Sequence, residues 1–192
     1  MFRRLSLLTL VCTVAAAGVA RSTTVIPPSF EALVAGANTI FVGEVMNIRS
    51  DWDTTPLGRV IMTFVTFRIE DVWKGNVGAV TQLAFLGGEI GDLGMKVHGM
   101  PTFRMGQRDV LFVGAEPRRI SPLVGLMYGR MRVERDTASG IDRVRTHDGQ
   151  ALGSLAQIGP QRPAPSLASI SPMRLSELES AVRARLGAAR PQ

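Results

Sequence analysis

The chain has 192 residues, with 22 Lys or Arg against 16 Asp or Glu, and a formal net charge of +6. One cysteine and two histidines exclude a disulfide framework and leave too few ligands for a zinc site. The length is sufficient for one domain with a sizeable core.

The N-terminus has the three parts of a secretion signal in order. Two arginines precede an apolar run over residues 5–14, and small residues follow up to Ala20. This pattern predicts a signal peptide over 1–20, which removes Cys12 from the mature chain and places it in the periplasm or the medium. No later stretch is long enough for a membrane span.

Two other interpretations of this segment stay open. A retained N-terminal anchor is the first. The second is a lipid anchor on Cys12, against which Val11 argues because a small residue is expected before a lipidated cysteine.

The positive charge is concentrated outside the predicted folded part. Residues 21–150 carry thirteen Arg and two Lys against fourteen acidic residues, whereas residues 151–192 carry five Arg against two Glu. The aromatic residues lie mainly at apolar strand positions and do not alternate with Arg on one face. The sequence therefore argues against nucleic-acid binding.

Helical and strand periodicities follow the signal. Ser29 is a good N-cap for a short helix, and residues 39–49 alternate as a strand. The clearest pattern is at 59–73, where apolar residues from Ile61 to Trp73 share one parity. A strand of this length serves two neighbours most easily in a small closed barrel.

Further strands are predicted at 79–86, 108–114, 123–135 and 141–146. Together they predict a mainly β fold, a small antiparallel OB-like barrel over residues 29–150 with a short N-terminal helix. A long Gly-rich connection over 87–106 interrupts the strands, and such connections often carry function.

The C-terminal part changes in composition. Residues 151–170 are rich in Pro, Ala and Ser and predict a linker, and residues 171–187 predict a helix capped by Ser171. The apolar stripe of this helix either packs on the barrel or contacts another protein or an anionic surface through Arg183, Arg185 and Arg190.

The search for catalytic groups finds little. His98 and His147 lack partners at ligand spacing, and no Gly-x-Ser-x-Gly motif is present. Glu70 and Asp71 are adjacent on a strand and should point to opposite faces. Glu89, at the start of the Gly-rich connection, is more typical of a turn acceptor than of a catalytic acid. We expect no enzyme activity, no metal and no cofactor.

Residues 37–75 combine a short helix, the strand ANTIFVGEVMNI and a long strand ending FRIEDVWKG. This order resembles the opening of netrin-like domains, including the tissue inhibitors of metalloproteinases. The runs GGEIG (87–91) and GMPTFRMG (99–106) are also similar to a family of uncharacterised exported bacterial proteins. The netrin-like resemblance implies an OB-type barrel that binds protein partners.

The chain departs from the metalloproteinase inhibitors where they act. Those inhibitors place an N-terminal cysteine on the catalytic zinc, and this chain has no cysteine near its predicted mature N-terminus. Recognition through the Gly-rich connection remains, with exposed apolar anchors on a held loop. The predicted partner-binding residues are Glu89, Met95, His98, Met100, Pro101, Phe103 and Met105. The alternative is that these residues fold back as a lid on the barrel.

Three functions follow from the sequence. The first is an exported module that binds a protein partner, with a protease as one candidate. The second is a structural or envelope-associated protein that assembles through its C-terminal helix. The third is a hydrolase that uses Glu89 or His98.

Overall fold

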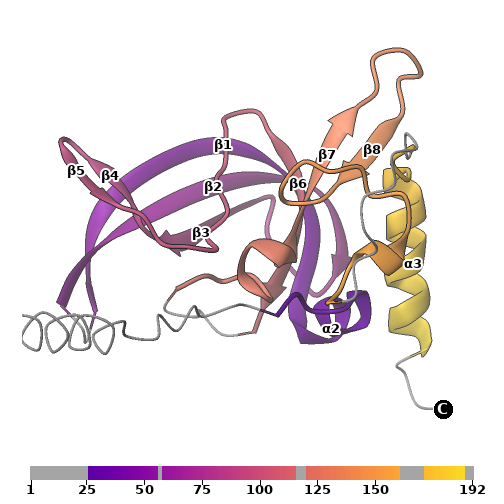
Figure 1. The fold of residues 1–192 in the computed structure, drawn as a ribbon, viewed down its shortest axis with the longest axis horizontal. Coiled ribbons are helices and arrows are strands. Elements are labelled where there is room, and N and C mark those ends of the chain that lie inside the picture. Colours follow the sequence, from indigo (N-terminus) through magenta and orange to yellow (C-terminus); the bar gives the residue numbers. More distant parts are fainter. Residues whose placement is uncertain (1–25, 56–57, 116–119, 161–170, 189–192) are drawn as a thin grey trace, which may run out of the picture.

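A computed structural model describes residues 26–55, 58–115, 120–160 and 171–188 of the chain. The predicted signal peptide over 1–20, including Cys12, and residues 161–170 of the predicted linker lie outside these ranges. Within them the chain forms an antiparallel six-stranded sheet in the order β3-β2-β1-β6-β7-β8, flanked by two helices (Figure 1). The mainly β prediction is confirmed.

The strands that form this sheet are β1 (Ala37–Thr55), β2 (Gly58–Lys74), β3 (Val80–Leu86), β6 (Arg108–Gly114), β7 (Arg130–Arg135) and β8 (Asp142–Arg145). A separate small hairpin consists of β4 (Gly88–Ile90) and β5 (Leu93–Met95). The hairpin contacts the far half of the long β1–β2 ribbon, which extends away from the helices (Figure 1).

The predicted N-terminal helix is confirmed as α2 (Phe30–Gly36). The hydroxyl of Ser29 accepts a hydrogen bond from the Ala32 amide at 3.2 Å and so caps the helix. At the other end, Lys74 donates from Nζ to the carbonyls of Val34 and Ala37 at 2.8 and 2.5 Å. These bonds join the end of β2 to the C-terminus of the helix.

The two faces of the sheet carry separate apolar clusters. One face packs against both helices through residues such as Ile40, Val110 and Phe112. The other face carries a cluster that includes Phe41, Phe67, Val65, Phe85 and Leu111. The Gly-rich connection lies against this second cluster through Phe103, which positions the site described below.

The sheet does not close into the predicted barrel. β3 and β8 are its edges, and they do not pair with each other. The edge of β8 is covered instead by the C-terminal part of the chain, because Arg145 bridges to Ala151 and Arg143 bridges to Arg174. Val144 also donates from its amide to the carbonyl of Met173 at 3.0 Å. These segments take the place that β3 would occupy in a closed barrel.

The predicted strand over 123–135 is shorter than expected. Only Arg130–Arg135 is a strand, and a 3₁₀ turn over Leu126–Gly129 precedes it. Gly125 has φ +67°, and a Cβ there would lie 2.6 Å from Pro28 Cγ. This left-handed position turns the chain before β7 begins.

The described part of the predicted linker, residues 151–160, is not extended. Leu152 is fully buried in the helix-side cluster, and Leu155 and Ile158 pack against it. Ser154 and Gln157 form a capping box on a short 3₁₀ turn. A composition rich in small residues suggested a linker, but three apolar side chains are enough to hold this segment to the core.

The C-terminal helix α3 (Leu175–Ala188) begins later than predicted. Ser171 does not cap it, because Met173 is hydrogen-bonded to Val144 and Leu152 and so continues the cover of β8. Leu178 and Val182 are fully buried against the sheet. The apolar stripe of the helix therefore packs within the chain. In the described ranges, no helix has both the length and the apolar character needed to cross a membrane.

Candidate functional site

The Gly-rich connection and the long β1–β2 ribbon enclose a groove of about 660 Å³. One wall comes from the β4–β5 hairpin, and another from the segment Met100–Phe103. The floor comes from the sheet through Ile48, Thr63 and Phe85. The lining is therefore mainly apolar, with Glu89 and Lys96 as its charged residues.

Most of the predicted partner-binding residues line this groove. Glu89, Met95, Met100, Pro101 and Phe103 are among its lining residues. The remaining two, His98 and Met105, are exposed and do not line it. The solvent-exposed fraction of Met105 is 62%. The structure thus brings five of the seven residues together.

Two consecutive glycines press the β4–β5 hairpin against the ribbon. Thr63 donates from its hydroxyl to the carbonyl of Gly87 at 2.6 Å, and Glu89 donates from its amide to the Ser50 hydroxyl at 3.4 Å. A Cβ on Gly88 would lie 2.4 Å from Thr63 Oγ1 and 2.5 Å from Ser50 Oγ. Only glycine permits this approach, which fixes the hairpin wall of the groove.

Phe103 is a packed residue and not a free anchor. Its ring lies 5.5 Å from the ring of Phe67 and 5.0 Å from that of Phe85, in edge-on and tilted arrangements. It is half-buried and packs on the second apolar cluster. This contact holds the Met100–Phe103 wall to the sheet, as the lid interpretation predicts for this residue.

A buried ion pair supports the same wall from below. Arg130 donates from Nε to Oδ1 of Asp109 at 2.9 Å, and the two side chains are 1% and 0% exposed. Arg130 also donates from Nη1 to the Thr102 carbonyl, and its guanidinium lies 4.4 Å from the centre of the Phe103 ring. One side chain therefore connects β6, β7 and the Gly-rich connection.

Burial governs the electrostatics of this pair. Removal from water raises the pKa of Asp109 and lowers the pKa of Arg130, and the attraction between the two charges opposes both shifts. Arg132 lies close enough to act on both groups. Asp109 Oδ2 and Arg130 Nη2 are buried without a hydrogen-bond partner among the described residues. The pair therefore carries a desolvation cost that its own contacts do not fully offset.

Sequence reasoning missed this pair. Asp109 and Arg130 occur in apolar strand patterns 21 positions apart, and nothing local marks them as partners. Charged neighbours hide them further, because Arg108 precedes Asp109 in β6 and Arg132 shares the strand parity of Arg130 in β7.

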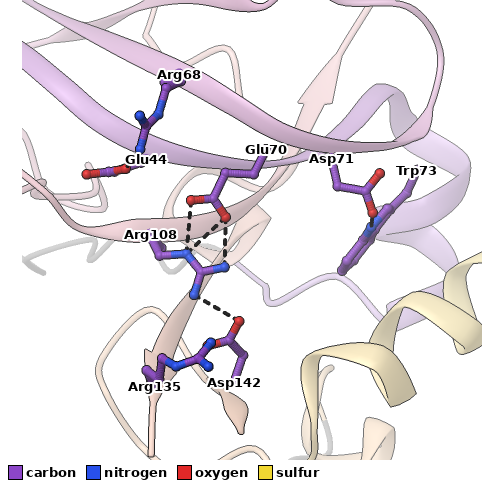
Figure 2. A network of polar contacts seen from close by, with 8 residues as sticks. All are labelled: Glu44, Arg68, Glu70, Asp71, Trp73, Arg108, Arg135 and Asp142. Atoms are coloured by element: carbon purple, nitrogen blue, oxygen red, sulfur yellow. Dashed lines mark hydrogen bonds and ion pairs between the residues drawn. The ribbon is translucent and has the colours of Figure 1, made fainter. Parts of the chain in front are cut away.

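The predicted acid and base residues do not form a catalytic arrangement. The prediction that Glu70 and Asp71 point to opposite faces of β2 is wrong, because a register shift between Val42 and Gly43 leaves Glu70 as an extra residue in β2 and brings both side chains to the same side (Figure 2). Glu70 accepts hydrogen bonds from Arg108 at 2.7 to 3.1 Å, whereas Asp71 accepts one from Trp73 Nε1 at 2.9 Å. Arg108 also contacts Asp142 at 3.0 Å, so that β2, β6 and β8 are linked across the sheet.

Glu89 and His98, the residues of the hydrolase hypothesis, have exposed side chains. Glu89 lines the groove, whereas His98 does not. In the described part of the chain, no three His, Cys, Asp or Glu side chains converge as a metal site would require.

A second, smaller cavity of about 280 Å³ lies at the helix side of the sheet. Tyr128, Thr146 and His147 line it together with Leu152 and Ile158. The rings of Tyr128 and His147 are 4.9 Å apart and edge-on. His147 follows the end of β8 and lies beside this ring.

No family model, no curated protein and no solved structure matches the chain. The netrin-like resemblance therefore stays a prediction from the sequence.

Proposed function

We propose that the chain is an exported binding module whose groove receives an apolar side chain of a protein partner. The observation that carries this proposal is the groove itself, because the β4–β5 hairpin and the segment Met100–Phe103 both line one mainly apolar hollow over the sheet. Hollows of this kind take the anchor residues of protein interfaces.

The chemistry of the walls supports a protein partner. Met95 and Met100 lie on the two walls, and unbranched thioether side chains adapt to anchors of different shape. The rim carries Glu89 and Lys96, one charge of each sign, which gives no preference for a strongly charged ligand. The Gly88 contacts and Arg130 hold the walls in place before binding. Little conformational entropy is therefore lost when a partner binds.

A protease is one candidate partner, because the resemblance to the metalloproteinase inhibitors implies it. The predicted mature N-terminus, after Ala20, carries no cysteine with which to chelate a zinc ion. An inhibitor of this kind would act through the groove and would leave the zinc untouched.

Assembly through the C-terminal helix is the other candidate function from the sequence. Leu178 and Val182 of α3 are fully buried within the chain. Assembly by this helix would then depend on its outer side, where Arg183 and Arg185 are exposed. We regard the groove as the better supported site.

The test is site-specific photocrosslinking in the secreted fraction of the source organism. A photoreactive residue at Met100, inside the groove, should form a crosslink to one discrete protein. The same residue at Met105, which is exposed on the same segment outside the groove, should not. Binding of the purified partner by Met100→Glu should then be weaker by about tenfold or more, because a charge must enter an apolar site. Equal crosslinks from both positions would contradict the proposal.

A further inference from the structure

We propose that Arg132 of β7 and Arg145 of β8 bind a tetrahedral oxyanion, such as phosphate or sulfate, beside Gly149. The site is separate from the groove, because none of these three residues lines it. The inference therefore goes beyond the proposed function and does not depend on it. Its basis is an arginine without a counter-charge on one face of the β7–β8 hairpin.

The β7–β8 hairpin contains one pair of like charges among its cross-strand neighbours. Two of its charged pairs are opposite in sign, Arg135 with Asp142 and Glu134 with Arg143. The third, Arg132 with Arg145, has two positive charges. Side chains directly opposite each other in an antiparallel pair lie close together on one face, and like charges there are destabilising. The fold therefore keeps one repulsive pair in an otherwise complementary hairpin.

Arg132 is also the one arginine on this face that lacks a carboxylate. The arginines that share the face are Arg130, Arg132, Arg143 and Arg145. Asp109 pairs with the first, Asp136 with the third and Glu134 with the fourth. Within the described part of the chain, Arg132 has neither a hydrogen bond nor an ion pair, and its Nε is buried. A half-buried cation in this state lacks a counter-charge.

Asp109 does not bond to Arg132, although the two residues are opposite each other in the β6–β7 register. Its Oδ1 accepts the bond from Arg130, and its Oδ2 has no hydrogen-bond partner among the described residues. Arg104 is exposed, has no ion pair in the described ranges and lies close enough to act on Arg130. Two positive charges, those of Arg104 and Arg132, therefore remain unmatched in this region.

The guanidinium groups of Arg132 and Arg145 meet at Gly149. Arg145 donates from Nη1 to the Gly149 carbonyl at 3.2 Å, and Arg132 Nη1 lies 3.3 Å from the position that a Cβ on Gly149 would take. Gly149 has φ +87°, a conformation that favours glycine, so this position carries no side chain that would separate the two groups. The terminal nitrogens of Arg132 are neither buried nor bonded to the described chain, so they can donate to a ligand.

A tetrahedral oxyanion suits two guanidinium groups better than a carboxylate does. Each planar guanidinium can donate two parallel hydrogen bonds to a pair of oxygens. A carboxylate offers one such pair of oxygens, and Glu134 already accepts from Arg145 Nε. Phosphate and sulfate offer additional oxygens and a second negative charge. An anion of this class can bridge Arg132 and Arg145, so that each guanidinium is attracted to the shared ligand.

The test is isothermal titration calorimetry of inorganic phosphate and of sulfate on the purified full chain, with sodium chloride holding the ionic strength constant. We expect saturable binding of both oxyanions with a dissociation constant of about 1 mM, as a few charge-assisted hydrogen bonds exposed to water would give. An absence of saturable binding to the wild type would overturn the site.

Arg132→Gln and Arg135→Gln are matched variants, because each removes one positive charge from β7. Arg135 is 67% exposed and already contacts Asp142. We expect R132Q to weaken phosphate binding by about tenfold or more and R135Q by less than about twofold. Equal losses in both variants would show that the overall charge of the chain attracts the anion, and would contradict a defined site.

Arg145→Gln tests the second guanidinium and keeps the proposal testable if R132Q does not fold. We expect R145Q to lower phosphate affinity by about tenfold or more, whereas wild-type affinity in R145Q would overturn the two-arginine site. Met100→Glu should leave phosphate binding unchanged, because Met100 lines the groove and the anion does not enter it. The two proposals can therefore fail independently.

Discussion

The guanidinium of Arg130 and the carboxylate of Asp109 form an ion pair of 2.9 Å that is almost completely removed from solvent. The same guanidinium bonds to the Thr102 carbonyl and lies over the ring of Phe103. The pair therefore connects the centre of the sheet with one wall of the groove. Its loss is expected to change both the stability of the fold and the shape of the site.

The contribution of this ion pair to the stability of the fold can be tested by removing one partner. Arg130→Met leaves the Asp109 carboxylate buried without a counter-charge, and we expect the free energy of unfolding to fall by about 3–5 kcal/mol in denaturant titrations. The double variant R130M/D109L should recover much of this loss, because no buried charge remains.

A surface ion pair of the same residue types provides the control. Arg135, which is 67% exposed, contacts Asp142 at 3.4 Å. Arg135→Met should change stability by no more than about 1 kcal/mol. A loss in R135M as large as the loss in R130M would show that burial is not the cause.

The pH dependence of stability shows whether desolvation of Asp109 outweighs its attraction to Arg130. Burial raises the pKa of Asp109 in the folded chain, with Arg130 and Arg132 as the charges nearest to it. The unfolded chain therefore loses this proton first as pH rises, so ionisation of Asp109 lowers stability above about pH 4. Relative to Asp109→Asn, the wild type should gain stability as the pH is lowered from about 7 to about 4.

The free energies of unfolding of the wild type and of D109N are compared over this pH range by denaturant titration. A wild type that loses stability relative to D109N on acidification would contradict the expectation. It would mean that attraction to Arg130 outweighs desolvation and that the folded-state pKa of Asp109 is lowered.

Local patterns predicted the parts of the fold whose cause is local. Ser29 caps α2, and the alternation over residues 59–73 belongs to a strand, because a cap and a parity are properties of a few neighbouring residues. The predicted strand at 108–114 has the bounds of β6.

The errors concern partners that are distant in sequence. Residues 50–55 are too polar to predict a strand, yet they extend β1 because each pairs with a residue of β2 between Gly58 and Thr63. In the same way Met173 pairs with Val144, which delays the start of α3 and covers β8 in place of a closing strand. Pairing between segments far apart leaves no local pattern, so neither the open sheet nor the Arg130–Asp109 pair could be predicted.

The site residues follow the same division. The Gly-rich composition and the methionines of 87–106 indicated the segment, and Met95 and Met100 do line the groove. No local pattern indicated that Met105 lies outside the groove, because the direction of a side chain in an irregular segment depends on contacts with the rest of the fold.

The position of the β4–β5 hairpin depends on Gly88, which has φ +141° and lies against Ser50 and Thr63. Gly88→Ala should destabilise the hairpin by about 1–3 kcal/mol through the backbone conformation and the close contacts. Hydrogen exchange should then be faster in the amides of residues 88–95 than in the wild type.

Gly94→Ala is the matched control in the same hairpin. A Cβ there meets only Glu89 Cγ, at the ordinary distance of 3.7 Å, and its φ is not in the left-handed region. Exchange in G94A should remain close to wild type. Equal acceleration in both variants would show that the contacts of Gly88 do not fix the hairpin.

The two lysines of the chain differ in what they bond. Lys74 donates to two carbonyls at the end of α2, whereas Lys96 is exposed at the groove rim. Lys74→Met should lower the free energy of unfolding by about 2 kcal/mol, because charge-assisted hydrogen bonds to the helix end are lost. Lys96→Met, measured in the same denaturant titration, should change it by less than about 0.5 kcal/mol. Equal effects would contradict the role of Lys74 as a helix cap.

The most direct test of the binding site compares two methionines of one segment. Met100 lines the groove, and Met105 is exposed outside it. With a partner identified by crosslinking, isothermal titration calorimetry on Met100→Glu and Met105→Glu measures what the groove contributes. We predict that M100E weakens the complex by about tenfold or more while M105E keeps wild-type affinity. Wild-type affinity in M100E, with the variant still folded, would contradict the groove as the site of binding.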